Sequence, residues 1–226
     1  AKGCTTTKVN TITEPSTLTV NFINQINENC FGGTNASVGA SPSGGTPNYT
    51  YSWTPGGATT SILSNVPIGT YTITVKDNKL CVTTNTVVIT QPTDIITTNT
   101  ITNVLCNGLT NGSISLNTTG GTSPYSYNWL PGGQTTSSVT GLAAGNYSVN
   151  VTDTKGCIKT NVYTVSQPSV LIASITQTNV SCFGGNNGAI NSNVSGGTAP
   201  YTYAWSSGSN VATANGLAAG PYTLTV

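Results

Sequence analysis

The chain has 226 residues, of which only 5% are charged, and its formal net charge is +1. All six basic residues are lysines, so the chain lacks the basic surface that neutralises phosphates, and nucleic acid is excluded as a main partner. A hydrophobic content of 36% at so low a net charge excludes a disordered chain, and no apolar run approaches the roughly 20 residues of a membrane-spanning helix.

A repeat with a period of 76 positions organises the whole sequence. Trp53, Trp129 and Trp205 set this period, since 129 − 53 and 205 − 129 both equal 76, and the cysteines follow it: Cys30, Cys106 and Cys182; Cys81 and Cys157. Proline marks the junctions in "ITEP", "ITQP" and "VSQP", where it interrupts strand pairing. We therefore predict the tail of a preceding repeat over 1–15, full repeats over 16–92 and 93–168, and a copy over 169–226 truncated before its last hairpin, as expected for a window into a longer array.

The elements of a copy follow one order, which residues 93–168 show most clearly. Alternation with period 2 predicts strands over 95–104, 113–119, 125–129, 134–140, 146–152 and 157–165. Gly, Pro, Asn and Asp separate these strands, as in "NG" and "DTKG". Six to seven short strands, with turns at intervals of about 8–12 residues, are typical of an immunoglobulin-like sandwich. The predicted fold class is all-β, with tandem immunoglobulin-like β-sandwich repeats at this period in a linear array.

An aromatic row lies on the third predicted strand of each copy. In "YSYNW", Tyr125, Tyr127 and Trp129 share one face of the strand. Tyr147, after "LAAG", resembles the corner tyrosine of immunoglobulin-like domains. The row recurs in phase with the strand pleat, so we predict that it faces the core, and an exposed platform for stacking sugars is the alternative. The predicted core aromatics are Tyr51, Trp53, Tyr71, Tyr127, Trp129, Tyr147, Tyr203, Trp205 and Tyr222.

The cysteines predict disulfides rather than a metal site. Zinc sites usually contain cysteines two to four residues apart, whereas the closest cysteines here, such as Cys81 and Cys106, are far from each other in sequence, and there is no histidine. Disulfides indicate an oxidising, extracellular location. They would also support a module this small, which is marginally stable by itself. The disulfide candidates are Cys4, Cys30, Cys81, Cys106, Cys157 and Cys182.

Three pairing schemes remain open from the sequence. Within a repeat, Cys30 would join Cys81, and Cys106 would join Cys157. The predicted topology places Cys106 and Cys157 at opposite poles of one sandwich, roughly 23 Å apart for a strand of about seven residues, whereas a disulfide needs Cα atoms within about 7 Å. The same topology brings Cys30 of one repeat near Cys157 of the next. A link from Cys81 to Cys106 across the junction is a third scheme.

The titratable residues do not predict an enzyme. Without histidine, and with the cysteines bridged, a nucleophile and its base are lacking. The five carboxylates are Glu14, Glu28, Asp77, Asp94 and Asp153, and two of them recur at the same turn, which indicates turn chemistry. Calcium-bound junctions need several carboxylates together. We therefore predict no catalytic residue, no metal and no cofactor.

Three motifs recur together, as in "SGGTAPYTYAW", "GLAAGPYTLTV" and "GNYSVNVTDTKGC". In combination they resemble the SprB-type repeat of large cell-surface adhesins of gliding Bacteroidetes, and the resemblance covers essentially the whole chain. The first full repeat departs from the pattern with "VPIG" for "LAAG", Asn48 for a proline, and "DNKLC" for "DTKGC". These departures weaken the turn prediction there without changing the spacing.

The resemblance implies a secreted protein, exported by the type IX route and displayed on the outer bacterial surface or in filaments. The expected function is a structural or adhesive repeat region that serves surface attachment and gliding motility. The alternative is a carbohydrate-binding array on the cell surface or on a secreted enzyme. Expected partners are neighbouring repeats of the same chain, with surface polysaccharide or an abiotic surface as further candidates, and lateral self-association of chains is left open.

Overall fold

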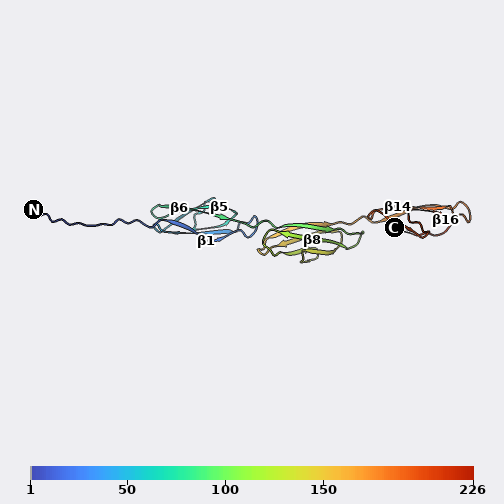
Figure 1. Ribbon diagram of the computed structural model, residues 1–226, viewed down its shortest axis with the longest axis horizontal. Coiled ribbons are helices and arrows are strands. Elements are labelled where there is room, and N and C mark those ends of the chain that lie inside the picture. Colours follow the sequence, from blue (N-terminus) through green and yellow to red (C-terminus); the bar gives the residue numbers. More distant parts are fainter. Residues whose placement is uncertain (1) are drawn as a thin grey trace. The chain divides into compact units, whose positions relative to one another are not determined.

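The computed structural model describes residues 2–226, and its regular structure is entirely β (Figure 1). The described residues form 17 strands, and they include no helix with the length and apolar character needed to cross a bilayer. The chain divides into two compact units. The first consists of the residues up to Ile95 with Gly120–Tyr125 and Thr152–Cys157, and the second consists of Ile96–Thr119, Ser126–Val151 and Ile158–Val226.

The first sandwich consists of two antiparallel sheets of three strands, with the orders β1-β2-β4 and β3-β5-β6. If the six strands are lettered A, B, C, E, F and G, these are the A-B-E and C-F-G sheets of the immunoglobulin fold without its D strand. The strands are β1 (Thr19–Ile26), β2 (Ala36–Ser43), β3 (Thr50–Thr54), β4 (Ile62–Val66), β5 (Gly69–Lys76) and β6 (Val82–Ile89).

Along the strands of the first sandwich, buried side chains alternate with less buried ones, and the buried ones form its core. In β5, Tyr71, Ile73 and Val75 are buried, and the threonines between them are only half-buried. Ile73 pairs with Trp53 of β3, whose side chain has no exposed surface. The indole therefore lies in the apolar centre between the sheets. The same core contains Val20, Ala36, Val38, Ala40, Leu63, Val87 and Ile89.

The second and third sandwiches repeat this plan. The sheet orders are β7-β8-β10 and β9-β11-β12 in the second, and β13-β14-β16 and β15-β17 in the third. The second contains β7 (Ile96–Thr102), β8 (Gly112–Thr119), β9 (Ser126–Leu130), β10 (Ser138–Leu142), β11 (Gly145–Thr152) and β12 (Ile158–Val165). The third contains β13 (Ile172–Thr178), β14 (Gly188–Ser195), β15 (Ala204–Trp205), β16 (Thr213–Leu217) and β17 (Leu224–Thr225).

One strand begins later than the alternation predicts. The prediction was 134–140, whereas β10 is Ser138–Leu142. The backbone N–H of Trp129 donates to the Gln134 carbonyl at 3.0 Å, and its indole N–H donates to the Thr136 carbonyl at 2.9 Å. These residues wrap the buried indole, so they are not available to pair in a sheet.

A tyrosine corner closes each sandwich. The hydroxyl donates to a backbone carbonyl four residues upstream, from Tyr71 to Pro67, from Tyr147 to Ala143 and from Tyr222 to Ala218, at 3.0, 3.0 and 3.1 Å. This is the hydrogen bond that defines the corner in immunoglobulin-like domains. It ties the start of β5 in the first copy and of β11 in the second to the turn before the strand, and Tyr222 makes the same bond just before β17.

Candidate functional site at the junction between repeats

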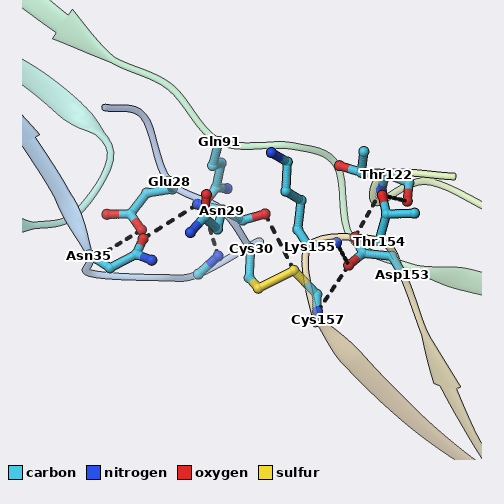
Figure 2. The surroundings of a disulfide bond; sticks show 11 residues. Glu28, Asn29, Cys30, Asn35, Gln91, Thr122, Asp153, Thr154, Lys155 and Cys157 are labelled. Atoms are coloured by element: carbon cyan, nitrogen blue, oxygen red, sulfur yellow. Dashed lines mark hydrogen bonds between the residues drawn. A yellow bond between two sulfur atoms is a disulfide. The ribbon is translucent and has the colours of Figure 1, made fainter. Parts of the chain in front are cut away.

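A buried aspartate organises the hairpin between the last two strands of a full repeat. One carboxylate oxygen of Asp153 accepts the N–H groups of Lys155 and Cys157, each at 2.9 Å, and the other accepts the N–H of Thr122 at 2.8 Å (Figure 2). Thr154 donates its backbone N–H to the Thr122 carbonyl in return, at 3.0 Å. The hairpin that carries Cys157 is thereby fixed to the turn that precedes the third strand.

The first repeat builds the same hairpin from a different sequence. Asp77 accepts the N–H groups of Thr46, Lys79 and Cys81, each at 2.8 Å. Leu80, with φ of +68°, stands where the second repeat has Gly156 at +81°. The aspartate bonds thus hold a leucine in a backbone conformation that favours glycine, and the departure from the repeat pattern does not alter the hairpin.

These bonds keep both aspartates ionised. At Asp77 the Thr46 N–H is the largest influence on the carboxyl pKa and lowers it against the opposing effect of burial. At Asp153 burial is the largest single influence and raises the pKa, but four backbone N–H groups together outweigh it, so the pKa again lies below its ordinary value. N–H donors stabilise the charged form of a carboxyl group. The aspartates therefore act as fixed anionic acceptors.

The double glycine before the third strand is needed for this contact. Gly121 has φ of +57°, and a Cβ atom there would lie 2.8 Å from an Asp153 carboxylate oxygen. Gly45 has φ of +62°, and its Cβ would lie 2.7 Å from the corresponding oxygen of Asp77. Any larger residue would push the carboxylate away from the threonine N–H that it accepts.

Cys30, Cys106 and Cys182 each lie on a loop between the first two strands of their copy, at the opposite pole of the sandwich. An asparagine side chain closes this loop by accepting the N–H of the residue before the cysteine. These bonds run from Asn29 to Asn35, from Leu105 to Asn111 and from Ser181 to Asn187, at 3.3, 3.1 and 3.1 Å. The loop therefore has one geometry in all three copies.

A glutamine at the junction also holds the loop. The Gln91 side-chain carbonyl accepts the N–H of Gly32 at 2.8 Å, and that of Gln167 accepts the N–H of Gly108 at 2.9 Å. The sequence reasoning treated "ITQP" and "VSQP" only as proline boundaries and missed this role. The recurrence of glutamine directly before the proline was the signal that could have revealed it.

Glu28 is a second residue whose role the sequence reasoning missed. Its side chain is only 5% exposed, and its two oxygens accept the N–H groups of Asn35 and Ala36 at 2.9 and 3.0 Å. The aligned residues in the other copies are Val104 and Val180. Glu28 is therefore a substitution found only in the first of the three loops, and both oxygens of its carboxylate accept backbone N–H groups of that loop.

A disulfide joins the loop of the first repeat to the hairpin of the second. Cys30 and Cys157 are bonded, with their Cα atoms 5.5 Å apart across 127 positions of sequence (Figure 2). The sulfur of Cys157 also lies 3.3 Å from the Asn29 carbonyl oxygen. This is a van der Waals contact and not a hydrogen bond, because a disulfide sulfur carries no hydrogen. Both cysteines belong to the first compact unit.

This bond decides between the pairing schemes. The within-repeat pairs, Cys30 with Cys81 and Cys106 with Cys157, are wrong because Cys30 and Cys157 are bonded to each other. The third scheme is also wrong, since Cys81 and Cys106 are free thiols. The free cysteines are Cys4, Cys81, Cys106 and Cys182, and all four are exposed.

The predicted core aromatics differ in burial. Trp53, Trp129, Trp205 and Tyr71 are 0–5% exposed. The other tyrosines of the set are only half-buried and lie at the edge of the core: Tyr51, Tyr127, Tyr147, Tyr203 and Tyr222. The hydroxyl explains this position, because each phenol must keep its polar end near a carbonyl, a hydroxyl or water. No indole face of the row is open for stacking.

The carboxylates do not assemble into a metal site. Among residues 2–226, no three His, Cys, Asp or Glu side chains lie close enough together to hold an ion. Glu28, Asp77 and Asp153 all spend their oxygens on backbone N–H groups. The chemistry that the junction offers is thiol chemistry, in which a cysteine on a fixed loop meets a cysteine on a fixed hairpin.

The fold and the junction define a class of protein, a tandem array of immunoglobulin-like β-sandwiches whose first two copies are joined by a disulfide. The family model for the SprB repeat matches residues 23–58, 98–134 and 174–210. The chain therefore contains three SprB repeats. Each matched segment runs from the first strand to the turn after the tryptophan and includes the loop cysteine.

Solved structures that match the chain are distant from it in sequence. They include murine CEACAM1b (15% identity over 67% of this chain and 100% of that one, TM-score 0.28). Two structures of Dscam also match. One is described as the structural basis for Dscam isoform specificity, and the other contains the four N-terminal immunoglobulin domains of Dscam1 isoform 6.44. Each is 12% identical, with 84% and 93% of this chain and 65% of theirs covered, at TM-scores of 0.26 and 0.24. No curated protein matches the chain in sequence.

Proposed function

We propose that the chain is a structural repeat region of a large secreted adhesin or filament on the bacterial cell surface, where it serves attachment and gliding. The observation that carries this proposal is the Cys30–Cys157 bond, which couples two successive repeats covalently. In a protein that transmits force along its length, a cross-link limits how far the chain extends when a module opens. The Cys30–Cys157 bond sets such a limit, because the chain between the two cysteines cannot extend while they are bonded.

The size of the closed loop supports a mechanical role. The bond closes 127 positions of chain, which the chain-entropy model equates with about 5 kcal/mol of stabilisation. Sandwiches as small as these bury a small core and are marginal as separate domains. A link of this size therefore contributes as much stability as a small domain commonly has in total.

The composition and the disulfide support an extracellular location. Disulfides persist in oxidising compartments and are rare in the cytosol. The surface is built from Thr, Ser and Asn with little charge, and the buried aspartates are used for turns. The SprB repeat, found in three copies, supports display on a cell surface. Adhesion, gliding and type IX export follow from the family resemblance and belong to the proposal.

Burial of the tryptophans weighs against the carbohydrate-binding alternative. Stacking on sugars needs an open aromatic face, and the three tryptophans of the row are 0–5% exposed. Their indole N–H groups donate to backbone carbonyls of their own repeats at 2.9–3.0 Å. The row is committed to packing, so the structural role is the function the chain supports best.

The test is made on cells that produce the protein. Antibodies against residues 16–168 should label intact cells, and deletion of whole repeats, which keeps the remaining copies in register, should reduce attachment and spreading. A purified chain should bind no glycan on an array. Labelling that appears only after permeabilisation, or attachment that survives complete deletion of the repeats, would contradict the proposal. The matched control is Phe31→Ser, which changes an exposed side chain and should leave display and attachment intact.

A further inference from the structure

The Cys30–Cys157 bond changes which part of the chain carries tension. A force applied at the two ends of the chain passes along the shortest covalent path between them. With the bond intact, that path runs from the N-terminus to Cys30, crosses the bond, and continues from Cys157 to Val226. The residues between the two cysteines lie outside the path and carry no tension.

Only one strand of each of the first two sandwiches lies on this path. In the first sandwich, β1 ends at Ile26, four positions before Cys30. In the second, Cys157 directly precedes β12, which begins at Ile158. Both are edge strands of their three-stranded sheets. Tension enters each strand at one end and leaves it at the other, so it runs along the strand and does not pull the strand away from its neighbours.

These two strands have almost no length left to give. Each has 8 residues, which span roughly 26 Å at the rise of a strand and about 29 Å at full extension. Detaching either strand from its sandwich would therefore lengthen the path by only a few ångströms, even with the bulge between Ile23 and Ile26. Force promotes a transition in proportion to the length gained, so tension hardly promotes this detachment.

The first sandwich is fastened to β1 on both sides. On one side, β1 pairs with β2 along its length. On the other side, the Asn85 side chain of β6 donates to the Val20 carbonyl at 2.8 Å, and the Gln25 side chain donates to the Val88 carbonyl of β6 at 2.8 Å. The rest of the sandwich is therefore attached to β1 without being part of the covalent path.

The second sandwich is fastened to β12 in the same way. β12 pairs with β11, and the hydroxyls of Thr160 and Thr164 donate to asparagine side chains of β11 at 2.7 Å each. On its other side, Tyr163 shares a hydrogen bond of 2.9 Å with Thr97 of β7. The second sandwich is thus also attached to a strand that is stretched only along its own axis.

We propose that the Cys30–Cys157 bond shelters the first two sandwiches from tension and makes β1 and β12 their load-bearing strands. With the bond intact, the sandwiches stay folded at forces that open them in its absence, and the chain is a stiff tether. Reduction of the bond transfers the load to the sandwiches and makes the same chain extensible. The inference depends on the bond and on the positions of two strands, and it holds whether or not the array serves attachment.

Reduction requires a thiol reductant. A thiolate of a dithiol such as dithiothreitol attacks one sulfur of the bond, which gives a mixed disulfide and releases one protein thiol. The second thiolate of the dithiol then closes the reductant into a cyclic disulfide and releases the other protein thiol. One protein disulfide is reduced to two thiols, and one dithiol is oxidised to one disulfide.

The test holds the full chain at constant force between handles at its two ends. The force is one at which the Cys30→Ser, Cys157→Ser double variant opens its first two sandwiches in separate steps. The unaltered chain is held at this force for the same time, and a dithiol is then added. Reduction should be followed by two separate steps, because the sandwiches are still folded when the load reaches them. The first sandwich releases 89 − 30 = 59 positions and the second 157 − 96 = 61, or about 210 and 220 Å of contour length.

A single step of about 450 Å at the moment of reduction would show that both sandwiches had opened behind the bond, and it would overturn the proposal. A chain held at low force for the same time before reduction is the control for opening without load. Tyr71→Phe is the matched variant, since it removes a hydrogen bond inside the sheltered part of the first sandwich. It should leave two steps after reduction and shorten the wait for one of them roughly fivefold, the effect of one lost hydrogen bond. An unchanged wait would also overturn the proposal, because the load would then not reach the first sandwich after reduction.

Discussion

Reduction of the Cys30–Cys157 bond should release a fixed length of hidden chain under force. The bond encloses 127 positions, so in the oxidised protein only 99 of the 226 residues can extend. At about 3.6 Å per residue, the oxidised chain should reach a contour length of about 360 Å and the reduced chain about 810 Å. The difference is about 450 Å, which single-molecule pulling resolves easily. The chain is pulled from handles at its two ends, with and without a reductant.

Two variants make this experiment decisive. Cys30→Ser with Cys157→Ser should give the long contour length with or without reductant. Cys81→Ser with Cys106→Ser, which removes two free thiols, should keep the short length until reductant is added. Equal contour lengths for the oxidised and reduced protein, or a shortening that depends on Cys81, would refute the pairing and with it the limit on extension that the bond is proposed to set.

Four further predictions concern the hairpin and the core. Asp153→Ala removes the acceptor of three N–H groups and should cost roughly 2–4 kcal/mol by chemical denaturation, whereas a surface change at Glu14 should stay within about 0.5 kcal/mol. Gly133→Ala should lower the free energy of unfolding by roughly 1–2 kcal/mol, because φ there is +66° but a Cβ atom has open space. Gly121→Ala should lower it by more, because it adds a clash with Asp153 to the same backbone strain. Equal losses for the two variants would contradict the contact between Gly121 and Asp153. The pKa values of the Asp77 and Asp153 carboxyls in the folded protein lie below the ordinary 3.8, so the stability that these carboxylates contribute is fully present above that pH and is lost as the pH falls through the folded-state values. Between pH 7 and pH 3, urea unfolding should therefore show a smaller fall in the free energy of unfolding for Asp153→Ala than for the unaltered chain. Trp129→Ala should cost about 3–5 kcal/mol, because the indole has no exposed surface and truncation leaves a cavity.

The sequence could place the cysteines in each sandwich but could not decide how they pair. The repeat period and the strand order placed one cysteine at each pole of a sandwich, and this placement agrees with the loop before β8 and the hairpin after β11. Whether the loop cysteine of one sandwich lies next to the hairpin cysteine of the following sandwich depends on how the chain passes from one sandwich to the next. No local sequence pattern encodes that arrangement. The sequence therefore left three schemes open, and the bond between Cys30 and Cys157, whose Cα atoms are 5.5 Å apart, decided among them.

The hydrogen-bond partners of Gln91 and Glu28 were missed for a related reason, although the recurrence of glutamine before the proline pointed to a role for Gln91. Both accept backbone N–H groups whose positions are set by a loop of irregular shape. Alternation and turn statistics describe strands and common turns, but they do not describe which side chain reaches into such a loop. Gln91 lies 59 positions from the glycine whose N–H it accepts.

The sequence by itself determined the period, the all-β fold and the place of each tryptophan. The period follows from residues that recur along the chain, and the other two properties are local: alternation with period 2 places a side chain on one face of a strand, and a large apolar ring on that face must be buried. Only the tertiary structure decided that Cys30 joins Cys157 and that Asp153 fixes the hairpin to Thr122. Each of these is a contact between segments distant in sequence, and such contacts exist only once the sandwiches have formed.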